Sequence, residues 1–237
     1  MASLIQARDL TKLYRMGDET VHALAGVNFD IARGEYCAIV GPSGSGKSTL
    51  MNIIGGLDTP TSGRIVIAGN DIGAMADDDL AVFRNQTIGF VFQSFNLLPR
   101  MTALENVELP MIYGGIAPKE RRERAAVLLE RVGLGARMTH RPTQLSGGQQ
   151  QRVAIARALA GSPALILADA PTGALDTNTG KEILALFGQL NREGATVVLV
   201  THDHEVAAAT KRTIEMRDGH IVSDRINGGT PRHDAHL

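Results

Sequence analysis

The segment at residues 41–49 constrains this chain more than any other. It has the sequence Gly-Pro-Ser-Gly-Ser-Gly-Lys-Ser-Thr, follows the apolar run 36–40, and leads into residues 48–57, whose apolar positions recur at helical spacing. A strand, a glycine-rich loop and a helix in this order are what a phosphate-binding loop requires. The sequence therefore predicts that residues 41–49, here called the phosphate loop, bind the phosphates of a nucleotide.

The residue types in the phosphate loop fit this chemistry. Gly41, Gly44 and Gly46 let backbone N–H groups converge on phosphate oxygens because they lack a Cβ, and the following helix directs its N-terminus at the anion. Lys47 is expected to reach the β- and γ-phosphates, and the Ser48 hydroxyl to bind Mg²⁺. An ordinary glycine turn is the alternative. The other loop residues predicted to contact the nucleotide are Ser43, Ser45 and Thr49.

Apolar runs elsewhere in the chain predict the sheet that carries this loop. Residues 164–168 and 196–200 are continuous apolar runs, typical of strands covered on both faces, and residues 182–190 between them have helical spacing. Strand–helix–strand alternation predicts a parallel sheet that is covered on both faces. Residues 27–31 and 63–70 indicate further strands, and residues 99–157 indicate helices inserted between the first strand and the later ones.

Composition excludes several classes of protein. The 237 residues are 43% hydrophobic with only 4% aromatics, so the core must be mainly aliphatic. The formal net charge of −1 argues against a broad basic surface, and no nucleic-acid partner is expected. The single cysteine, Cys37, rules out an internal disulfide and suggests a small buried side chain. No secretion signal and no apolar run of about 18 residues is present, so membrane attachment would require another protein.

Two further motifs carry candidate chemistry. Asp169 ends the apolar run 165–168, where a parallel sheet binds its ligands, and it is expected to act on Mg²⁺ through bound water. A cap of Thr172 is the alternative role. Residues 145–149, Leu-Ser-Gly-Gly-Gln, precede an alanine-rich helix at 150–160 and form a second candidate anion site. A plain N-cap by Ser146 is the alternative there.

Taken together, these motifs resemble the nucleotide-binding domain of an ATP-binding cassette (ABC) transporter over residues 3–222. The phosphate loop resembles the family's Walker A motif, residues 145–149 its signature, and residues 165–169 its Walker B strand. The resemblance assigns nucleotide contacts to Tyr14, which would stack on adenine, and to the signature residues Ser146, Gly147, Gly148 and Gln149. It also assigns a Q-loop glutamine that binds Mg²⁺, a D-loop aspartate and a switch histidine, which are Gln93, Asp176 and His202.

The resemblance implies a fold and an assembly. The expected fold is α/β, a P-loop NTPase (RecA-like) core with an N-terminal antiparallel β subdomain and an inserted α-helical subdomain. A single ABC ATPase domain is expected at 1–225, with 1–95 and 159–225 as core and β subdomain, 96–158 as helical signature subdomain, and 226–237 as a mobile tail. ATP and Mg²⁺ would lie between two head-to-tail copies, where Ser146 and Gly147 of one copy meet the γ-phosphate held by Lys47 of the other. A homodimer, or a pair with a similar subunit, is therefore expected.

One position departs from the family pattern. Ala170 follows Asp169 where the family has glutamate, the general base that polarises the attacking water. A methyl group can neither accept a proton nor orient water, and loss of a general base costs about 10²–10⁴-fold in rate. Either the site is naturally inactive or the residue is an engineered substitution. The matching residues at 93, 146, 176 and 202 favour the engineered substitution, in a chain that binds ATP and hydrolyses it very slowly.

A narrower resemblance suggests the partner. Residues 16–24, 51–58 and 92–99 look like the MacB/LolD group of exporters and lipoprotein-releasing systems, which also includes FtsE. The expectation is a peripheral ATPase subunit on the cytoplasmic face of the inner membrane, working with an integral membrane permease of MacB/FtsX-like type. Residues 94–101 and 104–116 are apolar, and they either pack internally or form a groove for that permease, to which Leu97 and Leu98 would belong. An FtsE-like subunit that regulates a cell-wall enzyme without transport is the alternative, and a soluble ABC protein of DNA repair or translation is disfavoured.

Overall fold

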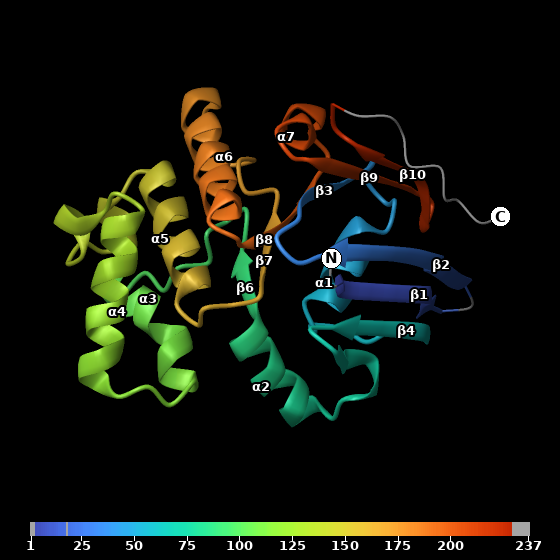
Figure 1. Ribbon diagram of the computed structural model, residues 1–237, viewed down its shortest axis with the longest axis horizontal. Coiled ribbons are helices and arrows are strands. Elements are labelled where there is room, and N and C mark those ends of the chain that lie inside the picture. The colour runs from blue at the N-terminus through green and yellow to red at the C-terminus, as the bar shows by residue number, and fades with distance from the viewer. Residues whose placement is uncertain (1–2, 18, 229–237) are drawn as a thin grey trace.

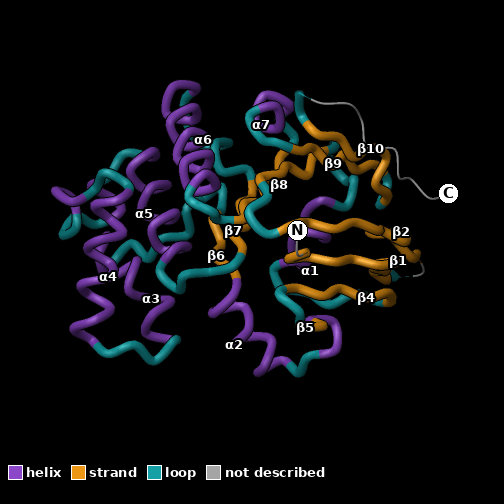
Figure 2. Tube along the Cα trace, viewed as in Figure 1, coloured by secondary structure: helices purple, strands orange, loops and turns teal. Residues whose placement is uncertain are grey.

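A computed structural model describes residues 3–17 and 19–228, and Figure 1 shows its arrangement. A central sheet lies between a group of helices on one side and an antiparallel sheet on the other, as the tube in Figure 2 also shows. The central sheet has the order β10-β9-β3-β8-β7-β6. Its strands are β3 (Tyr36–Val40), β6 (Ile88–Val91), β7 (Leu165–Asp169), β8 (Thr196–Thr201), β9 (Arg212–Arg217) and β10 (His220–Ile226).

The central sheet is parallel except at one edge. β3 pairs in parallel with β8 and β9, β7 pairs in parallel with β6 and β8, and β10 pairs antiparallel with β9. Every residue of β3 and β8 is buried, as the continuous apolar runs predicted. Alternate residues of β3 serve two cores: Ala38 joins the helical side, whereas Cys37 and Ile39 join the side of the antiparallel sheet. The predicted parallel, doubly covered sheet is confirmed.

The second sheet is antiparallel and has the order β2-β1-β4-β5. Between the two sheets lies α1, which buries Leu50, Met51, Ile53 and Ile54 against both. This helix ends at Ile54, earlier than the predicted residue 57, because two glycines follow it. The strands are β1 (Ser3–Met16), β2 (Glu19–Ala32), β4 (Ser62–Ile67) and β5 (Asn70–Asp71), and α1 spans Lys47–Ile54.

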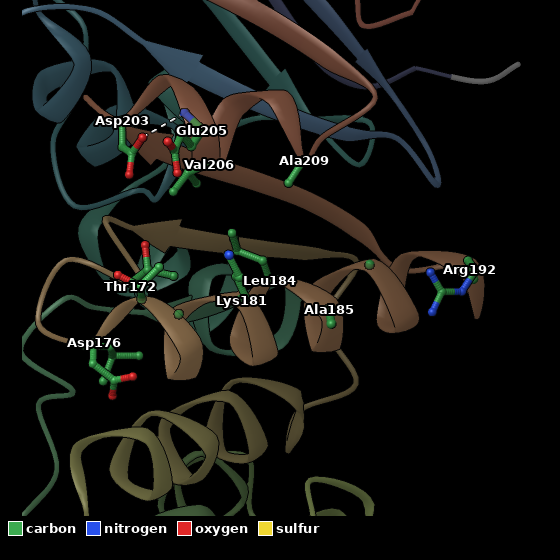
Figure 3. Close-up of a pocket in the computed structure, with 14 residues that line it drawn as sticks. Thr172, Asp176, Lys181, Leu184, Ala185, Arg192, Asp203, Glu205, Val206 and Ala209 are labelled. Atoms are coloured by element: carbon green, nitrogen blue, oxygen red, sulfur yellow. Dashed lines mark hydrogen bonds between the residues drawn. The ribbon is translucent and has the colours of Figure 1, made fainter.

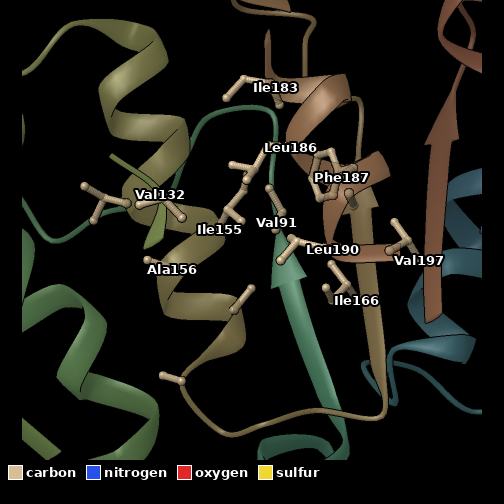
Figure 4. Close-up of a cluster of buried hydrophobic side chains, with 14 of the residues drawn as sticks. Val91, Val132, Ile155, Ala156, Ile166, Ile183, Leu186, Phe187, Leu190 and Val197 are labelled. Carbon is tan, nitrogen blue, oxygen red and sulfur yellow. The ribbon is translucent and has the colours of Figure 1, made fainter. Parts of the chain in front are cut away.

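The remaining helices pack on the other face of the central sheet or at its edge. Figure 4 shows α5 and α6 with Ile155, Leu186 and Phe187 against Val91 and Ile166 of the strands. The helices are α2 (Asp77–Thr87), α3 (Ala103–Tyr113), α4 (Pro118–Arg131), α5 (Gly147–Leu159), α6 (Thr177–Arg192) and α7 (His204–Ala208), with 3₁₀ turns at Ile72–Ala74, Gly135–Arg137 and Pro142–Gln144. Helices α3 to α7 share one hydrophobic core with this face of the sheet, whereas α2 buries Leu80 and Phe83 in the core on the side of the antiparallel sheet.

The C-terminal boundary differs from the predicted one. Ile226 is the last residue of β10, and the Asn227 side chain accepts a hydrogen bond from the Thr213 hydroxyl (3.0 Å) and donates to the Ala207 and Thr210 carbonyls. The prediction of a mobile tail that begins at 226 is therefore wrong for Ile226 and Asn227, and residues 229–237 lie outside the described residues. Of the helices that the structure describes, none is both long and apolar enough to cross a bilayer.

Candidate nucleotide-binding site

The phosphate loop connects β3 to α1, and its glycines are needed for two different reasons. A Cβ on Gly41 would lie 2.2 Å from the Met216 carbonyl oxygen, and one on Gly46 would lie 2.3 Å from the Ala23 carbonyl oxygen. These two glycines allow neighbouring strands to pack against the loop. Gly44 has φ +80° and faces open space, so its backbone is the one that leaves room for a ligand.

The N-terminus of α1 is open to an anion. Gly46 occupies the N-cap position with no side-chain hydrogen bond, and the first turn contains no acidic residue. First-turn N–H groups have no partner within a helix, so they are available to phosphate oxygens. The Lys47 ammonium donates to the Pro42 carbonyl (2.6 Å) and the Ser45 hydroxyl (3.2 Å), which places it over the loop.

The charge of Lys47 is not neutralised by an ion pair. Burial lowers the pKa of Lys47, while the nearby Asp169 carboxylate opposes that shift. Among the described residues, Lys47 forms no salt bridge with a carboxylate. A half-buried ammonium held by neutral oxygens fits a polyphosphate, which would supply the missing negative charge.

Asp169 lies at the same edge of the sheet. It ends β7, where its backbone pairs with Val200 of β8, and Val40 before the phosphate loop pairs with Thr201. Burial raises the pKa of Asp169, and the Lys47 ammonium opposes this shift. No hydrogen bond joins Asp169 to Thr172 in the described part of the chain, so the alternative role as a cap finds no support. Asp169 and the Ser48 hydroxyl fit an Mg²⁺ ion bound to phosphate oxygens.

Ala170 has an unusual and firmly held backbone. Its φ of 37° lies in the left-handed region, which residues other than glycine seldom adopt outside functional sites. Its N–H donates to the Val200 carbonyl (2.8 Å), and its carbonyl accepts from the Gly173 N–H (2.9 Å). The buried Gln151 amide donates to the Pro171 carbonyl (2.7 Å). The direction of the side chain at position 170 is therefore fixed.

Gln93 lies beside this turn. It follows β6, and its amide nitrogen is 2.9 Å from where a Cβ on Gly173 would lie, so the end of the Gln93 side chain packs against Gly173. The next residues in the loop, Phe95 and Asn96, both have positive φ. Arg157 of α5 donates to the carbonyls of Phe95 (2.8 Å) and Asn96 (2.5 Å), and burial lowers the pKa of this arginine. Spacing in the sequence gave no indication of Arg157 or Gln151.

The signature residues form the start of α5. Ser146 and Gln149 make a capping box, in which the Ser146 hydroxyl accepts from the Gln149 N–H (3.3 Å) and the Gln149 side chain accepts from the Ser146 N–H (3.0 Å). In the single chain, Ser146 therefore acts as the N-cap of α5, which is the alternative role that the sequence left open. Gly148 is required by packing, because a Cβ there would lie 2.3 Å from Cγ2 of Thr179. Gly147 lies near Leu175.

The signature is separate from the phosphate loop. The helix α5 belongs to the core on one face of the central sheet, whereas α1 belongs to the core on the other face (Figure 1). Among the described residues, no hydrogen bond links 146–149 with 41–49. One chain therefore does not bring its own signature to its own phosphate loop.

The remaining residues predicted from the sequence are Asp176, His202 and Tyr14, which lie in three different parts of the chain. Asp176 caps α6 by accepting from the Asn178 and Thr179 N–H groups, and these bonds lower its pKa together with the bond from the Thr179 hydroxyl. His202 is exposed after β8. Tyr14 of β1 is 37% exposed, and its hydroxyl donates to Asp58 (2.7 Å), just beyond the C-terminal end of α1. Tyr14 is therefore adjacent to the helix that begins at the phosphate loop.

A hollow of about 560 Å³ lies elsewhere, between α6 and α7 (Figure 3). Asp176 and Asp203 contribute to its wall, but no residue of the phosphate loop does. The position of this hollow therefore does not identify the nucleotide site. The charges of Lys47 and Asp169 and the glycines of the phosphate loop are better evidence for that site.

Comparisons with known proteins identify the family of this chain. The family model described as ABC transporter matches residues 24–173. An uncharacterized ABC transporter ATP-binding protein from Thermotoga maritima is 58% identical over 221 residues, which cover 93% of this chain and 94% of the relative. The macrolide export ATP-binding/permease protein MacB from Hyphomonas neptunium is 54% identical over 94% of this chain, which spans only 35% of that longer relative.

Solved structures agree as well. A dimeric ATP-binding cassette in a post-hydrolysis state bound to ADP and Pi has a TM-score of 0.87 and 50% identity, covering 95% of this chain and all of that one. A parallel sheet with a phosphate loop between β3 and α1 defines a P-loop NTPase. The chain belongs to the ABC transporter family, as one of its ATP-binding domains.

Proposed function

We propose that this chain binds ATP with Mg²⁺ at the phosphate loop and powers a membrane permease of MacB type. One observation supports the nucleotide site most directly: the Lys47 ammonium lies over the loop, at the open N-terminus of α1, and has no carboxylate partner among the described residues. Lys47 would bind the β- and γ-phosphates, and Tyr14 would stack on adenine. Ser48, Gln93 and Asp169 would hold Mg²⁺, which when bound neutralises charge on the phosphate oxygens.

A second copy would complete each site. The separation of the signature from the phosphate loop within one chain supports this, and so do the similar cassettes solved as dimers. In that pair, the α5 N-terminus of one copy, with Ser146 to Gln149, faces the γ-phosphate on the other. Light scattering with and without Mg-ATP tests it: we expect a dimer with Mg-ATP and a monomer with the Ser146→Arg variant, whose N-terminal cap position is exposed.

Hydrolysis is proposed to be slow because Ala170 supplies no general base. Asp176 and His202 remain in place, so ATP binding and dimerisation would persist while the attacking water lacks a proton acceptor. Restoring a carboxylate with Ala170→Glu is expected to raise phosphate release by about 10²–10⁴-fold. The measurement is single-turnover phosphate release from both forms in the presence of the permease, and equal rates would contradict the proposal.

The permease is proposed to be an integral membrane protein of MacB/FtsX-like type, so that the chain acts at the cytoplasmic face of the inner membrane. The relative from Hyphomonas neptunium supports this, because its name joins an ATP-binding part, to which this chain is similar, with a permease. Leu98 (47% exposed) and Tyr113 (81% exposed) offer apolar surface around α3 for such a partner. Mass spectrometry of the copurifying membrane protein tests this, and a six-helix import permease would overturn it.

A further inference from the structure

A small polar cluster connects Tyr14 to the far end of α1. The Asp58 carboxylate accepts from the Tyr14 hydroxyl through one oxygen (2.7 Å) and from the Lys12 ammonium through the other (2.5 Å). Lys12 also donates to the Thr59 carbonyl (2.7 Å), and its ammonium lies 5.1 Å from the centroid of the Tyr14 ring. The tyrosine ring is thus held at its hydroxyl and at one face.

The strand that carries Tyr14 needs such support. The pairing of β1 with β4 stops at Thr11, so beyond this residue β1 has β2 as its only paired strand among the described residues. A two-stranded ribbon is only marginally stable by itself. The Leu13 N–H donates to the Thr61 hydroxyl (3.0 Å), but that bond holds the backbone and leaves the ring free to turn. Asp58 and Lys12 restrain the ring itself.

Asp58 is in turn fixed to α1. It follows the Gly55–Gly56 turn that ends the helix, and its N–H donates to the Asn52 carbonyl (3.3 Å) of the last helical turn. The same helix begins at Lys47, over the phosphate loop. Since α1 is fixed in the core by its buried residues Leu50, Met51, Ile53 and Ile54, a bond at its C-terminal end sets where the ring lies relative to the phosphates at its N-terminal end.

The charge state of the cluster suits this role. Although burial acts to raise it, the pKa of Asp58 is lowered by the hydrogen bonds from Lys12, Tyr14 and the Thr59 N–H. The carboxylate is therefore ionised at neutral pH. Burial and the Asp58 carboxylate raise the pKa of Tyr14, so its hydroxyl remains a donor. Hydrogen bonds to an ionised acceptor are about twice as strong as neutral ones.

We infer that Asp58 is a positioning residue for the base end of the nucleotide, and that together with Lys12 it holds the Tyr14 ring at the distance from the phosphate loop that an adenine nucleoside triphosphate requires. This inference rests on the proposed binding of ATP at the phosphate loop. Asp58 itself contacts Tyr14 rather than the nucleotide. Its effect is therefore confined to ligands that carry a base.

The test compares a ligand with a base to one without. Isothermal titration calorimetry measures the Kd of Mg-ATP and of Mg-tripolyphosphate for the full chain and for Asp58→Ala, Asp58→Asn and Tyr14→Phe. We expect Asp58→Ala and Tyr14→Phe each to raise the Kd of ATP about tenfold, the size of one lost hydrogen bond to a charged group, and to leave tripolyphosphate unchanged. Asp58→Asn, which retains an acceptor oxygen, is expected to fall between. Asp71→Asn, a carboxylate of the same antiparallel sheet paired with Arg64, is the control that changes neither Kd.

The double variant Tyr14→Phe, Asp58→Ala separates positioning from general damage. If Asp58 acts through the Tyr14 hydroxyl, the double variant binds ATP no worse than either single one. Additive losses, an equal loss for both ligands, or no loss for either would overturn the inference. Failure of the proposed function looks different: the unchanged chain would then bind neither ligand more tightly than its Lys47→Ala variant.

Discussion

Arg212 offers the sharpest test of what holds the two sheets together. It lies on β9 with its side chain only 7% exposed, and it donates to the Glu35 carboxylate (2.8 Å), to both oxygens of Asp224 and to the Asp30 carbonyl (2.8 Å). The guanidinium thereby connects β9 and β10 of the central sheet to the end of β2 in the antiparallel sheet. Burial acts to lower the pKa of Arg212, but the hydrogen bonds and charges of Asp224 and Glu35 outweigh it and raise the pKa.

The change Arg212→Met keeps the apolar stem and leaves two carboxylates without their cation. Breaking a buried ion pair in this way costs about 3–5 kcal/mol. The carboxylates are 18% and 29% exposed, so water compensates part of this and we expect a loss of about 3 kcal/mol in the free energy of unfolding. For a chain of this size that corresponds to a fall in Tm of about 6–12 °C. Arg212→Lys should lose less stability than Arg212→Met because it keeps the positive charge. It should not reach the stability of the unchanged chain, because an ammonium cannot bind Asp224 with two parallel bonds.

Urea denaturation followed by circular dichroism at 222 nm, without nucleotide, gives the free energy of unfolding of each variant. The matched control is Arg64→Met, which removes an ion pair with Asp71 in which the arginine is 67% exposed and which should cost no more than about 0.5 kcal/mol. A loss below about 1 kcal/mol for Arg212→Met, or one equal to the control, would refute the reasoning.

Three further changes have defined outcomes. Tyr36→Phe should raise the free energy of unfolding by about 1 kcal/mol, because the buried Tyr36 hydroxyl has no hydrogen-bond partner among the described residues. Burial also raises the pKa of Tyr36 to about 12, above its ordinary value of 10.0, so the free energy of unfolding should fall as pH rises from 10 through 12, and this fall should be absent from Tyr36→Phe in urea titrations. Gly148→Ala should lower the Tm through a clash with Thr179, and an unchanged Tm would contradict the 2.3 Å approach. Arg157→Ala should make the loop after Gln93 cleave faster in limited proteolysis, and equal rates would show that other contacts hold it.

The parts of the fold that could be predicted are those in which local sequence and burial agree. The runs that became β3, β7 and β8 are apolar throughout because both faces of the sheet are covered. The short strand β6 was missed, and its Gly89 shows why. A Cβ there would lie 2.2 Å from the Ala158 carbonyl of α5, so a tertiary contact requires a residue of low strand propensity inside a strand.

The candidate site shows the same difference between features that local sequence predicts and features that tertiary contacts determine. Sequence motifs named the residues that are proposed to contact the nucleotide, but not the residues that hold these in place. Gln151 and Arg157 act on backbone carbonyls of other loops, and Asp58 acts on a side chain 44 positions away. Backbone carbonyls occur at every residue, so neither spacing nor residue type indicates which one a distant side chain will bind.

Ala170 shows what the structure adds to a departure that the sequence already reveals. The sequence says only that a carboxylate is missing beside Asp169. The structure shows that position 170 is left-handed, with its N–H bonded to Val200 and its carbonyl bonded to Gly173. Alanine and glutamate both carry a Cβ and neither is β-branched, so they meet similar strain at this φ, and the exchange of alanine for glutamate adds little backbone penalty and leaves both bonds intact. Ala170→Glu should therefore change the Tm little while raising phosphate release, and a large loss of stability would mean that the fixed direction at 170 cannot accept a carboxylate.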